Sequence, residues 1–472
     1  MKIPHIGYLL LLIVLLGNTT LFSQMKPGKG LVLGEVVDTI YCTAHAGQSY
    51  ALYLPKSYTP QKQWPIMYIF DPGANGAYPV RRFQKAAEAY GYILIGSNNS
   101  ENGSWKNSFA AANAMFDDTW SRFSIDTGRV YTSGFSGGAR VATAVAMNSG
   151  RIAGVIACGA GFPTVADYQP HADLDFAFVG IVGNLDMNFL ELNQVYDKLV
   201  DWKLPAQLIE FDGRHGWPHP DTVMMAFDFL EIQAVKTGLV VADAGQVAEI
   251  RQRANVIADT YLEDGRPLDA AIFLQRMVYA WEGIADVSAE KKRRAGLLKE
   301  KKTEKMAKSR RRALVKEADL QQAYSEQFLV DFRYPDDTAS TEFWKDQGEM
   351  LAKMKRSKDI ERGRMANRLI NQLWVRCYEL GGRAQREGKH RDAARLYRTW
   401  SLVQPAAIYP FIRAAVAYLA LGEKRKAIRY LERAVANGLL DPERLKISEL
   451  ANLKGEKKYE QLCDKLESRQ KN

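Results

Sequence analysis

Between residues 31 and 235, short apolar runs alternate with longer stretches of helical character, and this alternation limits the fold more than any other feature. It is typical of an α/β fold, in which helices cover a mostly parallel sheet. The first strands follow one another without an intervening helix, which predicts an antiparallel start to the sheet. The predicted strands are residues 31–40, 49–54, 65–70, 92–97, 130–133, 152–158, 176–182 and 207–211, and the predicted helices are residues 80–90, 110–123, 137–148, 188–202 and 220–233.

The spacing of glycine and proline changes near residue 240. The first 239 residues hold 24 of the 36 glycines and 12 of the 17 prolines, so residues that break regular structure are sparse in the remainder. A long segment with few breakers favours helices. The full length of 472 residues also exceeds what one hydrophobic core usually organises. We therefore expect a predominantly helical second half.

The C-terminal region repeats with a period of 34 residues. In each unit a glycine opens the turn between two helices, and small residues let the helices approach closely. The matching positions are Gly388 and Gly422, Ala393 and Ala427, Tyr397 and Leu431, Leu380 and Ala414, and Gly381 and Ala415. This pattern resembles the tetratricopeptide repeat, with Pro405 closing the first unit, and Gly265 with Ala270 marks a degenerate earlier unit. Fewer than three units are clear, so neighbouring helices must complete the core.

The N-terminus is typical of a signal peptide. Lys2 precedes an apolar stretch over residues 6–16, which is followed by small and polar residues up to Ser23. The stretch is shorter than the roughly 20 residues that span a bilayer, although an uncleaved anchor stays an alternative. We expect a periplasmic or secreted protein without a transmembrane span after cleavage. The predicted organisation is residues 1–23 signal peptide, 24–238 α/β domain, 239–370 helical region and 371–472 repeats.

The net charge of +10 has a local origin. Residues 291–316 contain 13 Lys or Arg and two Glu, which accounts for 13 − 2 = +11. Aromatic residues do not interrupt this stretch, so we expect a solvated helix, or a contact with an anionic surface, and no nucleic-acid partner. The cysteines, which are Cys42, Cys158, Cys377 and Cys463, lack the spacing of a zinc or thioredoxin-like site. We interpret them as structural thiols, with one disulfide left open.

A nucleophile motif occupies residues 134–138, which read Gly-Phe-Ser-Gly-Gly between a predicted strand and a predicted helix. A sharp strand-to-helix turn forces strained backbone angles on its central serine, and glycines two residues away on either side avoid steric collisions. The Ser136 hydroxyl would then project at a helix N-terminus. There the Gly137 N–H and the helix dipole can stabilise a developing oxyanion.

An aspartate and a histidine follow Ser136 along the chain, each near the end of a predicted strand, which gives the chain order Ser, Asp, His. His215 lies just beyond the last predicted strand, whereas His219 begins the next helix. Asp186 follows the strand over residues 176–182 and would orient His215. Asp173 and Asp175 precede that strand and would lie at the opposite end of the sheet. Such a site needs no metal or cofactor.

Residues 67–76, 134–138, 182–186 and 213–218 together resemble the α/β-hydrolase superfamily, and most of all the secreted esterases of the polyhydroxybutyrate-depolymerase and feruloyl-esterase type. The resemblance covers about residues 31–235. It implies a second oxyanion donor after an early strand, where this chain reads Asp71-Pro72 in place of the usual His-Gly. Pro72 has no N–H, so Gly73 or Ala74 would have to donate beside Gly137.

Three functions are consistent with these residues. The first is a carboxylesterase acting on small-molecule or polysaccharide-linked esters through an acyl-enzyme. The second is a peptidase of the prolyl-oligopeptidase type, which the absence of a propeller-sized segment before residue 31 disfavours. The third is a weakly active hydrolase whose helical half binds a protein partner.

Overall fold

One sheet of eight strands runs through the computed structural model, which describes residues 32–334 and 338–471. The strand order is β1-β2-β4-β3-β5-β6-β7-β8. β2 pairs antiparallel with β1 and β4, and the other neighbours are parallel, which confirms the α/β class and the antiparallel start. The strands are β1 (Val36–Tyr41), β2 (Ser49–Tyr53), β3 (Trp64–Phe70), β4 (Ile93–Ser97), β5 (Ile125–Phe135), β6 (Gly154–Cys158), β7 (Ala177–Gly183) and β8 (Ala206–Phe211). The predicted signal peptide lies outside the described residues.

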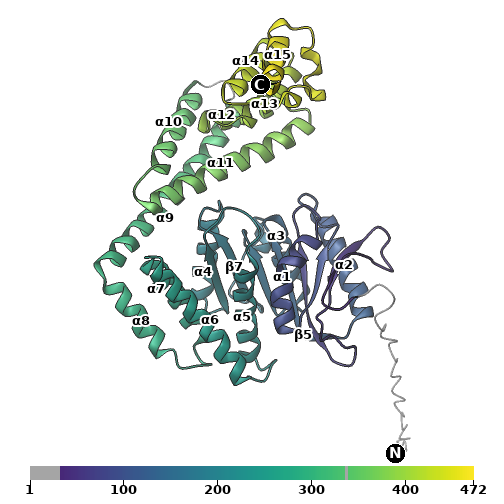
Figure 1. Ribbon diagram of the computed structural model, residues 1–472, viewed down its shortest axis with the longest axis vertical. Coiled ribbons are helices and arrows are strands. Elements are labelled where there is room, and N and C mark those ends of the chain that lie inside the picture. The colour runs from purple at the N-terminus through teal and green to yellow at the C-terminus, as the bar shows by residue number, and fades with distance from the viewer. Residues whose placement is uncertain (1–31, 335–337, 472) are drawn as a thin grey trace, which may run out of the picture.

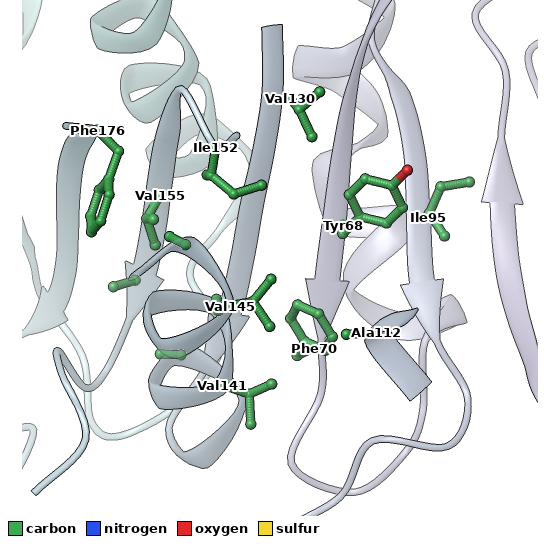
Figure 2. Close-up of a cluster of buried hydrophobic side chains, with 14 of the residues drawn as sticks. Tyr68, Phe70, Ile95, Ala112, Val130, Val141, Val145, Ile152, Val155 and Phe176 are labelled. Atoms are coloured by element: carbon green, nitrogen blue, oxygen red, sulfur yellow. The ribbon is translucent and has the colours of Figure 1, made fainter. Parts of the chain in front are cut away.

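Helices cover both faces of this sheet (Figure 1). Because side chains alternate along a strand, Tyr68 and Phe70 of β3 face one layer of helices while Met67 and Ile69 face the other. Figure 2 shows the first layer, where Val141 and Val145 point towards the strands. That layer contains α2 (Trp105–Arg122), α3 (Gly137–Ser149) and α4 (Phe189–Asp201), and the opposite layer contains α1 (Ala77–Tyr90) and α5 (Pro220–Lys236).

The described residues after about 240 are predominantly helical, as predicted. The 33-residue helix α9 leads from helices beside β8 to a separate group of helices above the sheet (Figure 1). None of the helices described over residues 32–334 and 338–471 is long and apolar enough to cross a membrane. The helices are α6 (Ala244–Glu263), α7 (Pro267–Trp281), α8 (Ser288–Lys299), α9 (Lys301–Arg333), α10 (Thr338–Lys355), α11 (Ile360–Arg386), α12 (His390–Val403), α13 (Tyr409–Ala420), α14 (Lys424–Ala436) and α15 (Lys457–Lys471).

The glycines of the 34-residue period lie in turns between helices. Gly388 joins α11 to α12 with a φ of 73°, and Gly422 joins α13 to α14 with a φ of 78°. Gly265, with a φ of 69°, opens an equivalent turn between α6 and α7. A Cβ on Gly381 would lie 2.7 Å from the Tyr397 ring, so the smallest residue is needed where α11 meets α12. The repeat positions therefore have the packing roles that their residue types indicate.

Buried ion pairs join the helical half to the sheet. Glu210 of β8 accepts hydrogen bonds from Arg276 of α7 and Arg310 of α9, each at 2.7 Å. Burial alone would raise the pKa of Glu210, but the two guanidinium groups hold it well below its usual range. Arg310 belongs to the basic stretch 291–316, most of which is solvated on α8 and α9. The prediction of a solvated helix is therefore wrong at Arg310.

All four cysteines are buried and free, which is consistent with structural thiols. Burial raises the pKa of the Cys158 and Cys377 thiols far above the ordinary value, because the thiolate is poorly solvated in an apolar core. These two groups therefore lack the thiolate character that a reactive cysteine needs.

Candidate active site

Ser136 occupies a strained turn between β5 and α3. Its φ of 53° and ψ of −118° are rare for a residue with a side chain, and such strain clusters at functional sites. A Cβ on Gly134 would lie 2.2 Å from the Gly138 carbonyl oxygen, and one on Gly138 would lie 2.0 Å from that of Phe70. Both glycines are therefore required by the backbone, as the motif predicts.

The strand order and this turn together decide the fold. The sheet starts antiparallel, continues parallel in this strand order, and carries a serine on the turn after β5. These three features define one known fold. The chain has the α/β-hydrolase fold. Within that fold, Asp186 follows β7 and His215 follows β8, so all three predicted residues lie at the carboxyl ends of parallel strands.

The structure brings these three side chains into one hydrogen-bonded chain. The Ser136 hydroxyl is 2.9 Å from His215 Nε2, and His215 Nδ1 lies 2.9 Å from each carboxylate oxygen of Asp186. An ionised carboxylate only accepts hydrogen bonds, so Nδ1 carries the proton and Nε2 is left to accept from the hydroxyl. Asp186 is 1% exposed, and the Asn188 N–H donates to it at 2.9 Å. The arrangement can transfer the hydroxyl proton to the imidazole.

The alternative residues lie elsewhere. His219 caps α5, its side chain is 73% exposed, and it contacts Asp221. Asp173 and Asp175 precede β7 and thus lie at the opposite end of that strand from Asp186. The geometry singles out the same three residues as the chain order.

Asp71 organises the segment in which a second oxyanion donor was expected. Its Oδ1 accepts a hydrogen bond from the Gly73 N–H at 2.8 Å, and the Ala74 N–H lies 3.3 Å from its carbonyl oxygen. Its Oδ2 accepts from Trp217 Nε1 at 2.8 Å, which ties this segment to the loop that carries His215. Both predicted N–H donors therefore already have acceptors within the loop. Gly137 stays at the N-terminus of α3, next to Ser136.

Asn102, which the sequence did not single out, lies against Gly137. A Cβ on Gly137 would be 1.8 Å from Asn102 Oδ1, so the carboxamide sits directly beside the residue after the nucleophile. The Asn102 N–H donates to the Pro72 carbonyl at 2.9 Å, which fixes the loop between β4 and α2. The run of asparagines that begins at Asn98 was the available signal, because loops after parallel strands collect functional groups.

A cavity of about 780 Å³ opens at Ser136. One wall comes from the sheet half, including Gly137, Arg140 and Asn188, and the other comes mainly from α11 of the helical half. Trp105 and Trp217 are not among the residues that line it. Helix α11 also touches the turn before the acid, because Arg368 donates to the Asn184 carbonyl at 2.9 Å.

Comparisons with known proteins give the following. No family model and no curated protein matches the chain. Among solved structures, the chain is similar to an S-formylglutathione hydrolase from Staphylococcus aureus, at 14% identity and a TM-score of 0.34 over 42% of this chain and 98% of that one. It is also similar to an esterase from Pyrobaculum calidifontis, at 14% identity and a TM-score of 0.36, over 44% of this chain and 87% of that one. A feruloyl esterase module from Clostridium thermocellum gives 15% identity and a TM-score of 0.33 over 42% and 86%.

Proposed function

We propose that the protein is a serine hydrolase that cleaves carboxylic esters, with Ser136 as nucleophile, His215 as general base and Asp186 as the group that orients the imidazole. The observation that supports this most is the continuous hydrogen-bonded chain from the Ser136 hydroxyl through His215 to the buried Asp186 carboxylate. The strained turn places the hydroxyl where α3 begins, and the cavity gives an ester access to it.

The reaction follows from the proton positions. His215 Nε2 accepts the Ser136 proton while Oγ attacks the ester carbonyl, and Asp186 stabilises the imidazolium. The imidazolium then protonates the alkoxide leaving group, which departs as an alcohol and leaves an acyl-serine. Water, deprotonated by the same imidazole, attacks the acyl carbon, and the proton returns to Ser136 as the carboxylic acid is released.

The oxyanion requires donors beside Ser136. The Gly137 N–H serves as the first donor in this proposal, since it combines with the positive end of the α3 dipole. The Asn102 carboxamide serves as the second, because it carries two N–H donors and lies beside Gly137, whereas Gly73 and Ala74 donate within their own loop.

Hydrolysis of p-nitrophenyl butyrate by the mature protein tests this function. Ser136→Ala is expected to lower kcat by a factor on the order of 10⁴ or more, since removing a nucleophile disables the whole catalytic unit. His219→Ala is the matched control, because that histidine is exposed and apart from the serine. Equal rates for wild type and Ser136→Ala, with both folded, would favour the binding-protein hypothesis.

We also propose that the activity is exported, on the strength of the signal-peptide pattern in residues 1–23. Fractionation of cells that express the full chain tests this. Full-length protein retained in the cytoplasm would contradict it.

A further inference from the structure

We propose that the ester bound at Ser136 carries an anionic group, a carboxylate or a phosphate, which the arginines of the cavity wall bind. This inference rests on the proposed function for the position of the scissile bond. It extends that function by naming the chemical class of the substrate.

Positively charged side chains outnumber negatively charged ones in the lining of the cavity. Five arginines line it against a single acidic side chain, Glu379, and no lysine takes part. The guanidinium group presents a planar fork of donors that matches both oxygens of a carboxylate or phosphate, which an ammonium group does not. The arginines are Arg140, Arg376, Arg383, Arg386 and Arg413.

One of these arginines is already neutralised. Arg140 forms a two-pronged ion pair with Glu191, at 2.8 and 3.0 Å, so it belongs to the structure of the sheet half. Within the described ranges 32–334 and 338–471, none of the other four forms an ion pair. They leave a positively charged wall that faces the nucleophile across the cavity.

Neutral partners hold two of the four in place. Arg376 donates to the Ser325 hydroxyl at 3.1 Å and lies 4.5 Å from the Phe328 ring centroid. Arg413 donates to the Gln385 carboxamide at 3.0 Å and the Tyr397 hydroxyl at 3.3 Å. These contacts orient both guanidinium groups without cancelling their charge. Both side chains are half-buried, where an uncompensated charge is costly, and a bound anion would relieve that cost.

Arg383 and Arg386 complete the wall about two and three turns further along α11 from Arg376, and both are exposed. They extend the positive field towards solvent, where it can attract an anion into the cavity. The volume of about 780 Å³ suits a ligand with an acyl chain between the ester and the charged end. The geometry therefore separates the reacting end of the substrate, at Ser136, from its charged end, at α11.

The test compares esters that differ only in terminal charge: p-nitrophenyl hexanoate, mono-p-nitrophenyl adipate and the phosphonate of the same chain length. For wild type we expect kcat/KM to favour an anionic ester by about tenfold or more, the effect of one charge-assisted hydrogen bond. The preferred anion identifies carboxylate or phosphate. Raising ionic strength from about 0.1 M to about 1 M should reduce the preference. Equal kcat/KM values for the neutral and both anionic esters would overturn the inference while leaving the hydrolase function standing.

Two variants assign the preference to the wall. Arg376→Gln, and separately Arg383→Gln combined with Arg386→Gln, should each lower the anionic-to-neutral ratio of kcat/KM by about tenfold. The second variant changes only exposed side chains, so its folding is not at risk. Arg391→Gln, at an exposed arginine of α12 outside the cavity, is the matched control and should keep the wild-type ratio. A wild-type ratio in both wall variants would refute the assignment.

Binding to Ser136→Ala separates this inference from the proposed function. Calorimetric titration with the adipate and phosphonate esters should show binding that the hexanoate ester lacks, whether or not the wild type turns any ester over. An absence of hydrolysis in the wild type would overturn the esterase function alone. An absence of anion-dependent binding would overturn the inference alone.

Discussion

Arg368 offers the sharpest test of how the helical half supports the active site. Its side chain is fully buried, its Nε lies 2.8 Å from Glu317 Oε1, and its Nη1 donates to the Asn184 carbonyl at 2.9 Å. Asn184 stands two residues before Asp186, so the guanidinium group links α9, α11 and the turn that ends in the acid. We expect Arg368 to act as a positioning residue for Asp186.

The expected loss in the free energy of unfolding follows from the burial of both the Arg368 and the Glu317 charge. Arg368→Ala leaves Glu317 buried without its counter-charge, and breaking such a pair typically costs about 3–5 kcal/mol in the free energy of unfolding. Replacing both members, as in Arg368→Met with Glu317→Leu, removes the unpaired charge and is often close to neutral for stability. Both the single and the double variant lose the hydrogen bond to the Asn184 carbonyl. The double variant therefore separates a loss of positioning from a loss of stability.

Urea denaturation followed by tryptophan fluorescence gives the stability, and p-nitrophenyl butyrate hydrolysis gives kcat. We expect the double variant to keep most of the wild-type free energy of unfolding but to lose roughly tenfold or more in kcat, because small misplacements of catalytic groups cost rate steeply. A double variant that is stable and has the wild-type kcat would refute the positioning role. A stable Arg368→Ala single variant would refute the energetic argument.

Three further substitutions test other parts of the structure. Asn102→Ala should lower kcat by about 10²–10³ with little change in KM, the usual effect of losing one oxyanion donor, and unchanged kcat would exclude the carboxamide from that role. Gly138→Ala should prevent native folding, measured as lost soluble yield, because its Cβ would lie 2.0 Å from the Phe70 carbonyl oxygen; a well-folded variant would contradict the requirement for glycine at this position. Glu210→Gln should cost about 3–5 kcal/mol at pH 7, since it leaves two buried arginines unpaired. The pKa of Glu210 is depressed in the folded state, so its contribution to the free energy of unfolding is fully present above the unfolded pKa of about 4.3. That contribution is lost as pH falls from there through the lower folded-state pKa. The free energies of unfolding of variant and wild type should therefore approach each other in acid.

The sheet could be predicted from sequence because its signals are local. Buried parallel strands such as β7 read as continuous apolar runs, and the predicted span 176–182 differs by one residue at each end from the observed one. Strand β5 was predicted too short, at residues 130–133, because polar residues over 126–129 hide its first half. The edge strand β1 begins at Val36, later than predicted, because a turn at Gly34, with a φ of 78°, interrupts the apolar run before it.

The sequence predicts the site residues that directly follow a strand, but it does not predict contacts between segments that are far apart in the chain. Ser136, Asp186 and His215 each follow a strand, so the topology alone brings them to one edge of the sheet. The role of Asp71 could not be deduced, because its hydrogen bond to Trp217 joins residues 146 positions apart. The same holds for α11, whose place over the nucleophile depends on contacts such as Arg368 with Asn184, 184 positions apart.

The arginines of the helical half show that the position of a charge in the sequence does not predict whether its side chain is solvated, buried or part of the cavity. Arg310 lies within the basic stretch that sequence reading treats as solvated, yet it is buried against Glu210, while Arg376 lies outside that stretch and lines the cavity. Arg368 uses the guanidinium fork, because it contacts a carboxylate and a carbonyl at once. Lysine can keep the charge at such sites but not the paired donors. Arg368→Lys should therefore behave more like the alanine variant than like the wild type in kcat, and a lysine variant with full activity would show that charge alone holds the acid turn.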